Sequence, residues 1–296
     1  MTCVAHASSS SQEGTPFQPV IDRLPAVSLR VQEYRLGVEP VLSPRSLWRR
    51  YLPFFREVNA NVGGFSVRLA SALRTDDFEK KLRNGSFDFL IVEPHRVLEM
   101  EQLQYVVFAQ AGAKDRIYGV IVTRDDTNVS RLHQLRGKTF CFGRKHALAS
   151  TLLPRMWLRE AGFAERSAKI VFTGSDETAL FHVSKGLAEA AAVSATAWER
   201  FVNDHPRAAS SMQVRWRTDT LSGAAVMAHR RVPPRHLVQL EAALTRMNST
   251  NSGNQALAAA GLKSLRSADS SAYDDVWAFL VTYARLFGYR APGVEP

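Results

Sequence analysis

The sequence contains few cysteines and no long apolar run. Only Cys3 and Cys141 occur among the 296 residues. Cys3 lies in a stretch of small and polar residues and Cys141 in an apolar segment, so we expect no disulfide between them. No CxxC or Cys/His cluster has metal-ligand spacing, and we expect neither a metal nor a cofactor. No apolar run reaches the roughly 18 residues that a membrane-spanning helix needs.

Recognisable catalytic motifs are also missing. The sequence has no Gly-x-Ser-x-Gly, no Walker loop and no HExxH. The adjacent acids Asp76-Asp77 and Asp274-Asp275 fall at expected helix starts, where negative charge is favoured by the helix dipole. We therefore expect a protein that is not an enzyme.

The charge is strongly positive but is not concentrated anywhere. The formal net charge is +10, and the densest basic places are the triplets at 48–50, 215–217 and 229–231. None is a basic run, and no helix–turn–helix, zinc-finger or RNP pattern occurs. We expect no nucleic-acid partner; binding through charge alone, the weaker alternative, would depend steeply on salt.

The amino-terminal stretch has the composition of a tail. Residues 1–27 are rich in serine and contain neither a positive segment nor an apolar core of the kind found in signal peptides. This composition predicts a disordered tail. It leaves the compartment open between the periplasm and the cytoplasm.

Strands and helices alternate along the rest of the chain. The pattern β-α-β-α-β occurs once before about residue 117 and again after it, which predicts an α/β protein with mostly parallel sheets in two Rossmann-like lobes. We expect lobe 1 to comprise residues 28–117 and 222–296, and lobe 2 residues 118–221, joined by crossovers near 112–118 and 218–223. The expected strands are 28–36, 65–69, 87–92, 105–109, 118–123, 138–142, 169–173, 188–193, 213–217 and 224–228. The main expected helices are 44–58, 76–84, 150–161, 195–203, 234–247, 255–260 and 271–287, with two further ones ending near Met100 and at Gly186.

One stretch, residues 137–154, indicates where a ligand could bind. Its sequence GKTFCFGRKHALASTLLP predicts a strand, a loop broken at Gly143 and a helix start. Helix starts present unpaired N–H groups and a partial positive charge, which suits an anion. The alternative is an ordinary helix whose start is capped by Ser150. The loops after Phe142, Thr173 and Val193 should lie at the carboxyl ends of lobe 2 strands, where open α/β sheets bind ligands.

Three segments carry a resemblance to a known family. They are GSFDFLIVEPHRVLEM, RIYGVIVTRDDTNVSRLHQLRGKTFCFG and TGSDETALFHVSKGLAEAAAV, found in this order. In these segments the chain resembles the type II periplasmic solute-binding proteins, in the phosphate, phosphite and phosphonate branch (PhnD-like) that serves ABC transporters. The resemblance covers roughly residues 28–290. It implies a type II periplasmic binding protein fold with two hinge crossovers.

The family's ligand-binding positions are largely altered in this chain. The resemblance places a Ser-Thr-Ser-Gly run of the family on the segment 147–150, where only Ser150 is a hydroxyl residue. It places the family's histidine on Ser175 or Asp176 and its acidic residue on Ser194. Its lobe 1 tyrosines fall near Thr75 and Val92. The family's phosphonate specificity is therefore not carried over to this chain.

Other side chains could still hold an oxyanion. Backbone N–H groups together with Ser150, Thr151, Ser194 and His146 form one such set. His95 follows Glu93-Pro94 at the end of a lobe 1 strand and could face the cleft, or it could have a capping or surface role. The Cys141 thiol could take a soft ligand such as trivalent arsenic, or it could be a buried packing residue.

These observations predict a solute-binding protein. We expect it to capture a small ligand, an oxyanion of the phosphonate, phosphite or arsenic-oxyanion class, between its lobes. The partner would be an ABC permease or a sensor histidine kinase, and we expect a periplasmic monomer. The alternative is a cytosolic effector-binding or scaffold protein that kept the fold and changed the ligand.

Overall fold

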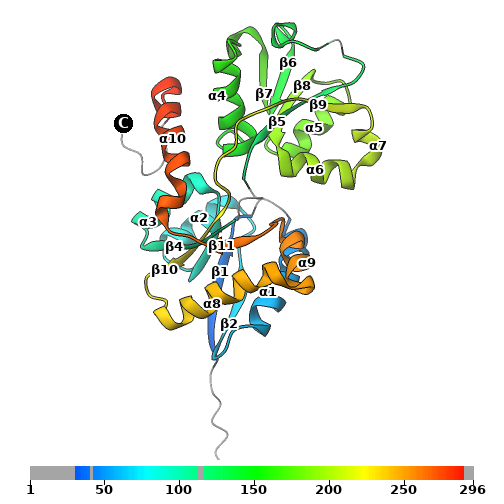
Figure 1. Ribbon diagram of the computed structural model, residues 1–296. Helices are drawn as coiled ribbons and strands as arrows, with labels where there is room; N and C mark the ends of the chain where they lie inside the picture. The colour runs from blue at the N-terminus through cyan, green and yellow to red at the C-terminus, as the bar shows by residue number, and fades with distance from the viewer. Residues whose placement is uncertain (1–30, 41–42, 112–115, 128, 290–296) are drawn as a thin grey trace, which may run out of the picture. The chain divides into compact units, whose positions relative to one another are not determined.

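The computed structural model describes residues 31–40, 43–111, 116–127 and 129–289. The expected tail 1–27, and Cys3 within it, lie outside these residues. No helix in the described part of the chain combines the length and the apolar character needed to cross a bilayer. The described elements form two lobes, each built on its own sheet (Figure 1).

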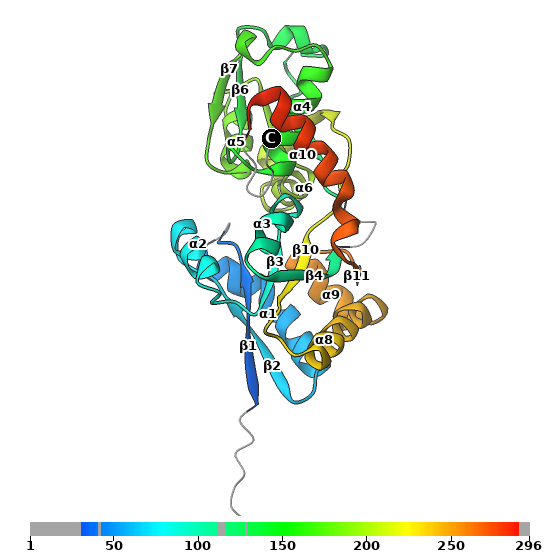
Figure 2. The same ribbon diagram turned by 90° about the vertical axis from the view of Figure 1, so that its left-hand side faces the viewer.

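Lobe 1 contains a six-stranded sheet in the order β11-β4-β10-β3-β1-β2. Strands β1, β2 and β3 pair in parallel, whereas β10 and β11 run antiparallel to their neighbours. Figure 2 shows β1 and β2 side by side at the edge of this sheet. The strands are β1 Gln32–Val38, β2 Phe65–Ala70, β3 Phe89–Val92, β4 Tyr105–Ala111, β10 Ala225–His229 and β11 Leu265–Ser267.

Lobe 2 contains a five-stranded sheet in the order β7-β6-β8-β5-β9. Strand β6 pairs in parallel with β7 and β8, and β5 runs antiparallel to β8 and β9. The strands are β5 Gly119–Arg124, β6 Thr139–Phe142, β7 Lys169–Phe172, β8 Ala190–Ser194 and β9 Met212–Arg217.

The two-lobed α/β fold is confirmed, and most strands of each sheet run in one direction, but β5 and β10 run antiparallel to the strands on either side of them. The reason lies in the two crossovers between the lobes. Strands β5 and β10 each begin just after the chain has passed from one lobe to the other, so both run away from the crossovers. The strands β3 and β8 end near the other lobe instead, and they therefore pair antiparallel with β10 and β5. Hydrophobic periodicity marks a strand but does not give its direction.

The helices agree closely with the expected segments, with two short elements added. Strand β11 and helix α7 were not expected, and the helix predicted from Ser150 begins with a π-helical turn, η4, Leu148–Leu152. Short 3-10 turns are η1 Pro94–Arg96, η3 Leu132–Leu135, η5 Glu165–Ser167, η6 Met247–Ser249 and η7 Ser270–Tyr273. The α-helices are α1 Pro44–Ala60, α2 Thr75–Arg83, α3 Val97–Gln102, α4 Leu153–Glu160, α5 Asp176–Ser184, α6 Ala195–Asp204, α7 Pro206–Ala209, α8 Pro234–Arg246, α9 Asn251–Ala260 and α10 Asp274–Phe287.

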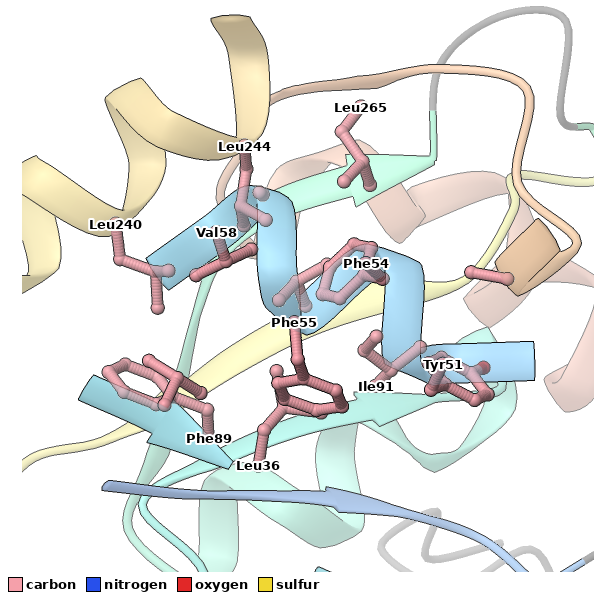
Figure 3. Close-up of a cluster of buried hydrophobic side chains, with 14 of the residues drawn as sticks. Leu36, Tyr51, Phe54, Phe55, Val58, Phe89, Ile91, Leu240, Leu244 and Leu265 are labelled. Atoms are coloured by element: carbon pink, nitrogen blue, oxygen red, sulfur yellow. The ribbon is translucent and has the colours of Figure 1, made fainter. Parts of the chain in front are cut away.

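The core of lobe 1 is built around α1. The helix starts as its sequence predicts, because Ser43 accepts a hydrogen bond from the Ser46 N–H and Pro44 occupies the first turn. Its apolar face packs on the sheet and on α8 (Figure 3). The buried side chains drawn there include Leu36, Tyr51, Phe54, Phe55, Val58, Phe89, Ile91, Leu240, Leu244 and Leu265.

Helix α10 belongs to a second buried cluster that contains residues of both lobes. Its side chains Val276 and Leu280 lie in one cluster with Val97 of α3 and Leu152 of η4. The Tyr283 hydroxyl also meets the Arg155 guanidinium of α4 at 2.9 Å. Helix α10 (red in Figures 1 and 2) therefore joins the two lobes through apolar packing as well as through a hydrogen bond.

The two crossovers pair with each other. Ile117 and Leu221 form an antiparallel bridge with two backbone hydrogen bonds of 2.9 Å each. The Asp275 carboxylate of α10 accepts hydrogen bonds from Arg116 on one crossover and from the Ser222 N–H on the other. The described parts of the crossovers therefore form one double connection that contacts α10.

Candidate ligand-binding site

A cavity of about 820 Å³ lies between residues of the two lobes. We call it the large cavity. Lobe 1 contributes the first turns of α1 and the end of β3, and lobe 2 contributes the starts of η4, α5 and α6. The volume falls in the range of pockets that enclose small organic ligands.

The loops that follow β7 and β8 are tied together at this cavity. Ser175 caps α5 by accepting from the Thr178 N–H, and Ser194 caps α6 by accepting from the Ala197 N–H. Asp176 Oδ2 accepts from the Ser194 N–H at 3.0 Å and from its hydroxyl at 2.9 Å. These local hydrogen bonds fix the helix starts that face the cavity.

Gly143 is required for this arrangement. A Cβ atom at this position would lie 2.1 Å from Asp176 Oδ1 and 2.9 Å from the Asp176 backbone nitrogen. Both contacts are far shorter than real Cβ contacts. Only glycine therefore allows the strand β6 to approach the start of α5 this closely.

An ion pair between the lobes forms part of the cavity wall. The Arg144 guanidinium of lobe 2 donates to Glu93 Oε1 at 2.8 Å and to Glu39 Oε1 at 3.4 Å, and both acids belong to lobe 1. Glu93 Oε2 accepts from the Leu148 N–H at 3.4 Å. The carboxylate of Glu93 thus lies against the start of η4, where unpaired N–H groups favour a negative charge.

The charges around this pair affect one another. Burial alone would raise the pKa of Glu93, but His95, Arg144 and the Leu148 N–H outweigh it and lower the pKa below the usual value. Burial raises the pKa of Glu39, with Arg144 opposing the shift. Burial lowers the pKa of His95, with Glu93 opposing the shift. Glu93 is therefore the more firmly ionised of the two acids.

A second cavity of about 470 Å³ adjoins the first. We call it the small cavity. It shares Glu93, Arg144 and Ala147 with the large cavity. A second ion pair lines it, in which Arg96 donates two hydrogen bonds to Glu79, of 2.8 and 2.9 Å. Both arginines on the wall of the small cavity, Arg96 and Arg144, therefore have carboxylate partners.

The structure divides the site residues expected from the sequence into three groups. Ser150, Ser175, Asp176 and Ser194 line the large cavity. Thr75, His95 and His146 line the small cavity. Thr151 and Cys141 line neither of these two cavities and are fully buried.

Thr151 and Cys141 have structural contacts instead. The Thr151 hydroxyl donates to the Arg144 carbonyl oxygen at 2.8 Å and so holds the loop that carries this arginine. Cys141 lies in the core of lobe 2, with its Sγ atom 3.8 Å from His182 Nδ1. Burial raises the pKa of the Cys141 thiol to about 11.

Several charged residues of the site were not expected from the sequence. Glu93 and Arg144 form the pair between the lobes, and the arginines Arg49, Arg50 and Arg200 line the large cavity. The triplet at 48–50 was visible as a dense basic place, but sequence alone does not separate a cavity wall from a solvated surface. No group of three acidic, histidine or cysteine side chains in the described part of the chain could hold a metal ion.

Comparison with known proteins gives the family. A family model described as "ABC transporter, phosphonate, periplasmic substrate-binding protein" matches residues 36–273. Among curated proteins, a probable ABC transporter phosphite binding protein, PhnD1 of Prochlorococcus marinus, is 26% identical over 95 residues. That match spans 31% of this chain and only 32% of the relative's length.

Solved structures of the same fold cover most of the chain. A binding protein component of an ABC phosphonate transporter from Pseudomonas aeruginosa has a TM-score of 0.73 at 15% identity, covering 86% of this chain and 87% of that one. PhnD1 from Prochlorococcus marinus in complex with methylphosphonate has a TM-score of 0.72 at 18% identity, covering 87% and 98%. The fold is thus the type II periplasmic binding protein fold, and the chain belongs to the family of periplasmic substrate-binding proteins of phosphonate ABC transporters.

Proposed function

We propose that this protein captures a small oxyanion in the large cavity and presents it to an ABC permease in the periplasm. One observation carries the proposal: a cavity of about 820 Å³ whose wall is shared by the two lobes and carries hydroxyl and guanidinium groups. A ligand held there would contact both lobes at once. We expect binding without chemical conversion of the ligand.

The connection between the lobes supports a closing motion. The paired crossovers, with Ile117 bridged to Leu221, form a short hinge. A ligand that contacts both lobes favours the closed arrangement by the difference between its affinities for the closed and the open states. Ser150, Ser175 and Ser194 are the hydroxyl residues that we propose as contacts from lobe 2.

The relatives support the ligand class. The Prochlorococcus marinus protein is named as a phosphite binding protein and its structure as a complex with methylphosphonate, and the Pseudomonas aeruginosa protein is named as a component of a phosphonate transporter. Oxyanions of this kind accept hydrogen bonds from serine hydroxyls, backbone N–H groups and guanidinium groups. All three kinds of donor are present around the large cavity.

A thermal-shift screen tests the proposal. The panel comprises phosphate, phosphite, methylphosphonate, arsenite, arsenate and small organic acids. A ligand at 100 times its Kd stabilises the native state by about 2.7 kcal/mol, which corresponds to a rise in Tm of several degrees. We expect such a rise with at least one anion; no rise with any of them would contradict the proposal.

The partner requires a separate measurement. If the protein serves a permease, a strain in which the gene for this protein is deleted loses uptake of the radiolabelled ligand identified in the screen. If it serves a sensor kinase, uptake continues and the transcriptional response to the ligand is lost. We expect loss of uptake, restored by the wild-type gene.

A further inference from the structure

Three arginines of the large cavity have no carboxylate partner. Arg49 and Arg50 lie on α1 in lobe 1, and Arg200 lies on α6 in lobe 2. None of their guanidinium groups makes an ion pair or a hydrogen bond with a residue that the structure describes. We call them the arginine cluster.

Apart from Asp204, the other ionised groups on the cavity wall have partners. Arg144 pairs with Glu93 and Glu39, and Glu177 Oε1 lies 2.9 Å from His205 Nε2. Asp176 accepts two hydrogen bonds from Ser194. Asp204, also on the wall, attracts Arg50 without forming an ion pair with it. The arginine cluster therefore leaves this part of the wall with excess positive charge.

The cluster brings like charges from the two lobes together. Burial, followed by repulsion from Arg200, lowers the pKa of Arg50, and Asp204 only partly opposes this. Two guanidinium groups on opposite lobes repel one another when the lobes approach. A bound anion between them would replace that repulsion by two attractions.

The start of η4, the other place suited to an anion, is already filled. Glu93 Oε2 accepts from the Leu148 N–H, and Glu93 Oε1 accepts from Arg144. A second negative group there would be repelled by the Glu93 carboxylate. An anionic ligand is therefore directed away from η4 and toward the arginine cluster.

The size of the large cavity indicates more than an inorganic ion. An inorganic oxyanion has about five heavy atoms, whereas pockets of 300–1,000 Å³ enclose drug-sized ligands. The cavity also offers the hydroxyls of Ser150, Ser175 and Thr196. These suit the polar body of an organic molecule.

We propose that Arg49, Arg50 and Arg200 form an anion subsite that takes an organic ligand with at least two negative charges gathered at one end. The uncharged body of the ligand then lies over the hydroxyl residues at the starts of η4, α5 and α6. This proposal rests on the proposed function, because it names the ligand class of the same cavity.

Isothermal titration calorimetry on the full chain tests the subsite. The probes are glucose 6-phosphate, citrate and ATP as organic polyanions, inorganic phosphate and methylphosphonate as small anions, and glucose as a neutral body. We expect at least one organic polyanion to bind more tightly than either small anion, and glucose not to bind.

Two matched pairs of variants locate the binding. Arg50→Gln and Arg200→Gln should each raise the Kd for the polyanion by about tenfold or more, because each substitution removes a charge-assisted hydrogen bond. Arg45→Gln, exposed on the same helix as Arg50, and Arg207→Gln, exposed on α7, should leave the Kd unchanged. Circular dichroism and the Tm of each variant verify that it is folded.

The outcomes separate the two proposals. If a small anion binds the wild type, and Arg50→Gln and Arg200→Gln bind it equally well, the arginine subsite is wrong and the proposed function stands. If organic polyanions bind with no loss in either variant, the subsite is wrong as well. If no anion binds the wild type, both proposals fail.

Discussion

At the scale of single residues, the Glu93 carboxylate occupies the start of η4, a position suited to an anion. Its carboxylate reaches the Leu148 N–H with one oxygen and the Arg144 guanidinium with the other. Without Glu93, the Leu148 N–H would be free for a ligand and Arg144 would keep only its 3.4 Å contact with Glu39. The protein thus supplies its own negative group at the start of η4.

Replacing Glu93 by glutamine should open this position. We expect Glu93→Gln to bind inorganic phosphate about tenfold more tightly than the wild type, because Arg144 and the Leu148 N–H gain a free site and lose a repelling charge. Calorimetry at constant salt measures the change. Glu160→Gln, exposed on α4, is the control and should bind phosphate as the wild type does. Weaker or equal phosphate binding in Glu93→Gln would contradict this account.

The same variant should show a pH-dependent stability. The pKa of Glu93 is lowered in the folded protein, so its contribution is present above its unfolded pKa of about 4.5 and is lost as pH falls through the folded value. Glu93 and Arg144 are 33% and 40% exposed, so solvent screening limits the contribution to about 1 kcal/mol. Urea unfolding should show Glu93→Gln less stable by this amount at pH 7, with the difference shrinking as the pH falls below 4.5 toward the folded pKa. A constant difference across this range would exclude the ionised pair as the cause.

Cys141 should be chemically inert in the folded protein. Its side chain is fully buried and its pKa is raised to about 11, so only about one thiol in a thousand is ionised at pH 8. In a Cys3→Ser background, we expect no reaction with a thiol reagent until denaturant is added. Arsenite should then give the same Tm shift, or none, in the wild type and in Cys141→Ala. Rapid labelling of the native protein would restore the thiol as a ligand candidate.

At the scale of elements, the approach of β5 to η4 and α4 depends on Gly119. A Cβ atom at this residue would lie 2.5 Å from the Ala149 carbonyl oxygen and 2.6 Å from Pro154 Cγ. The Gly119 N–H also donates a hydrogen bond to the Thr218 hydroxyl at 2.9 Å, which restrains the start of β5. The first strand of lobe 2 is therefore held directly against the helix start that carries Ser150.

Gly119→Ala should destabilise the protein by about 1–3 kcal/mol, because the added methyl group overlaps backbone and ring atoms and forces the elements apart. Denaturant unfolding gives the loss. Gly63→Ala is the control, because the nearest atom to a Cβ there is 4.0 Å away. Equal stability of the two variants would show that η4 can move away at no cost.

The sequence predicted the bounds of most helices and strands better than it predicted the contacts between them. The cap Ser43 and the break at Gly143 placed α1 and the end of β6 almost to the residue. Strand β11 has only three residues, which is too short to show an alternation of polar and apolar residues. The direction of β5 and β10 depends on contacts between residues that are far apart in the chain. The serines of the large cavity could be predicted because they follow strand ends. The pairing of Glu93 with Arg144 could not, because it joins residues 51 positions apart across two lobes.

At the scale of the whole molecule, α10 makes the lobes share one core. Leu280 is fully buried in a cluster that also contains Leu148 and Leu153 of lobe 2 and Met100 of lobe 1. Apolar surface buried between two lobes stabilises both, so neither should unfold alone. We expect one heat-absorption peak in differential scanning calorimetry.

Leu280→Ala tests this shared core. The variant should lose about 2–5 kcal/mol, the usual cost of truncating a fully buried leucine, and its transition should broaden or divide. Val281→Ala, on the same helix but 46% exposed, should lose much less. Two separate transitions in the wild type would show that α10 does not couple the lobes.

The bridge between Ile117 and Leu221 has a consequence for engineering. The segment that runs from one to the other begins and ends at adjacent points, joined by backbone hydrogen bonds. Such a segment can be exchanged for the equivalent segment of a relative that supplies the apolar residues packed on α10, because the rest of the chain keeps the same pair of neighbouring ends. New binding specificities could then be built by exchanging lobe 2 at two positions of the chain that are hydrogen-bonded to each other.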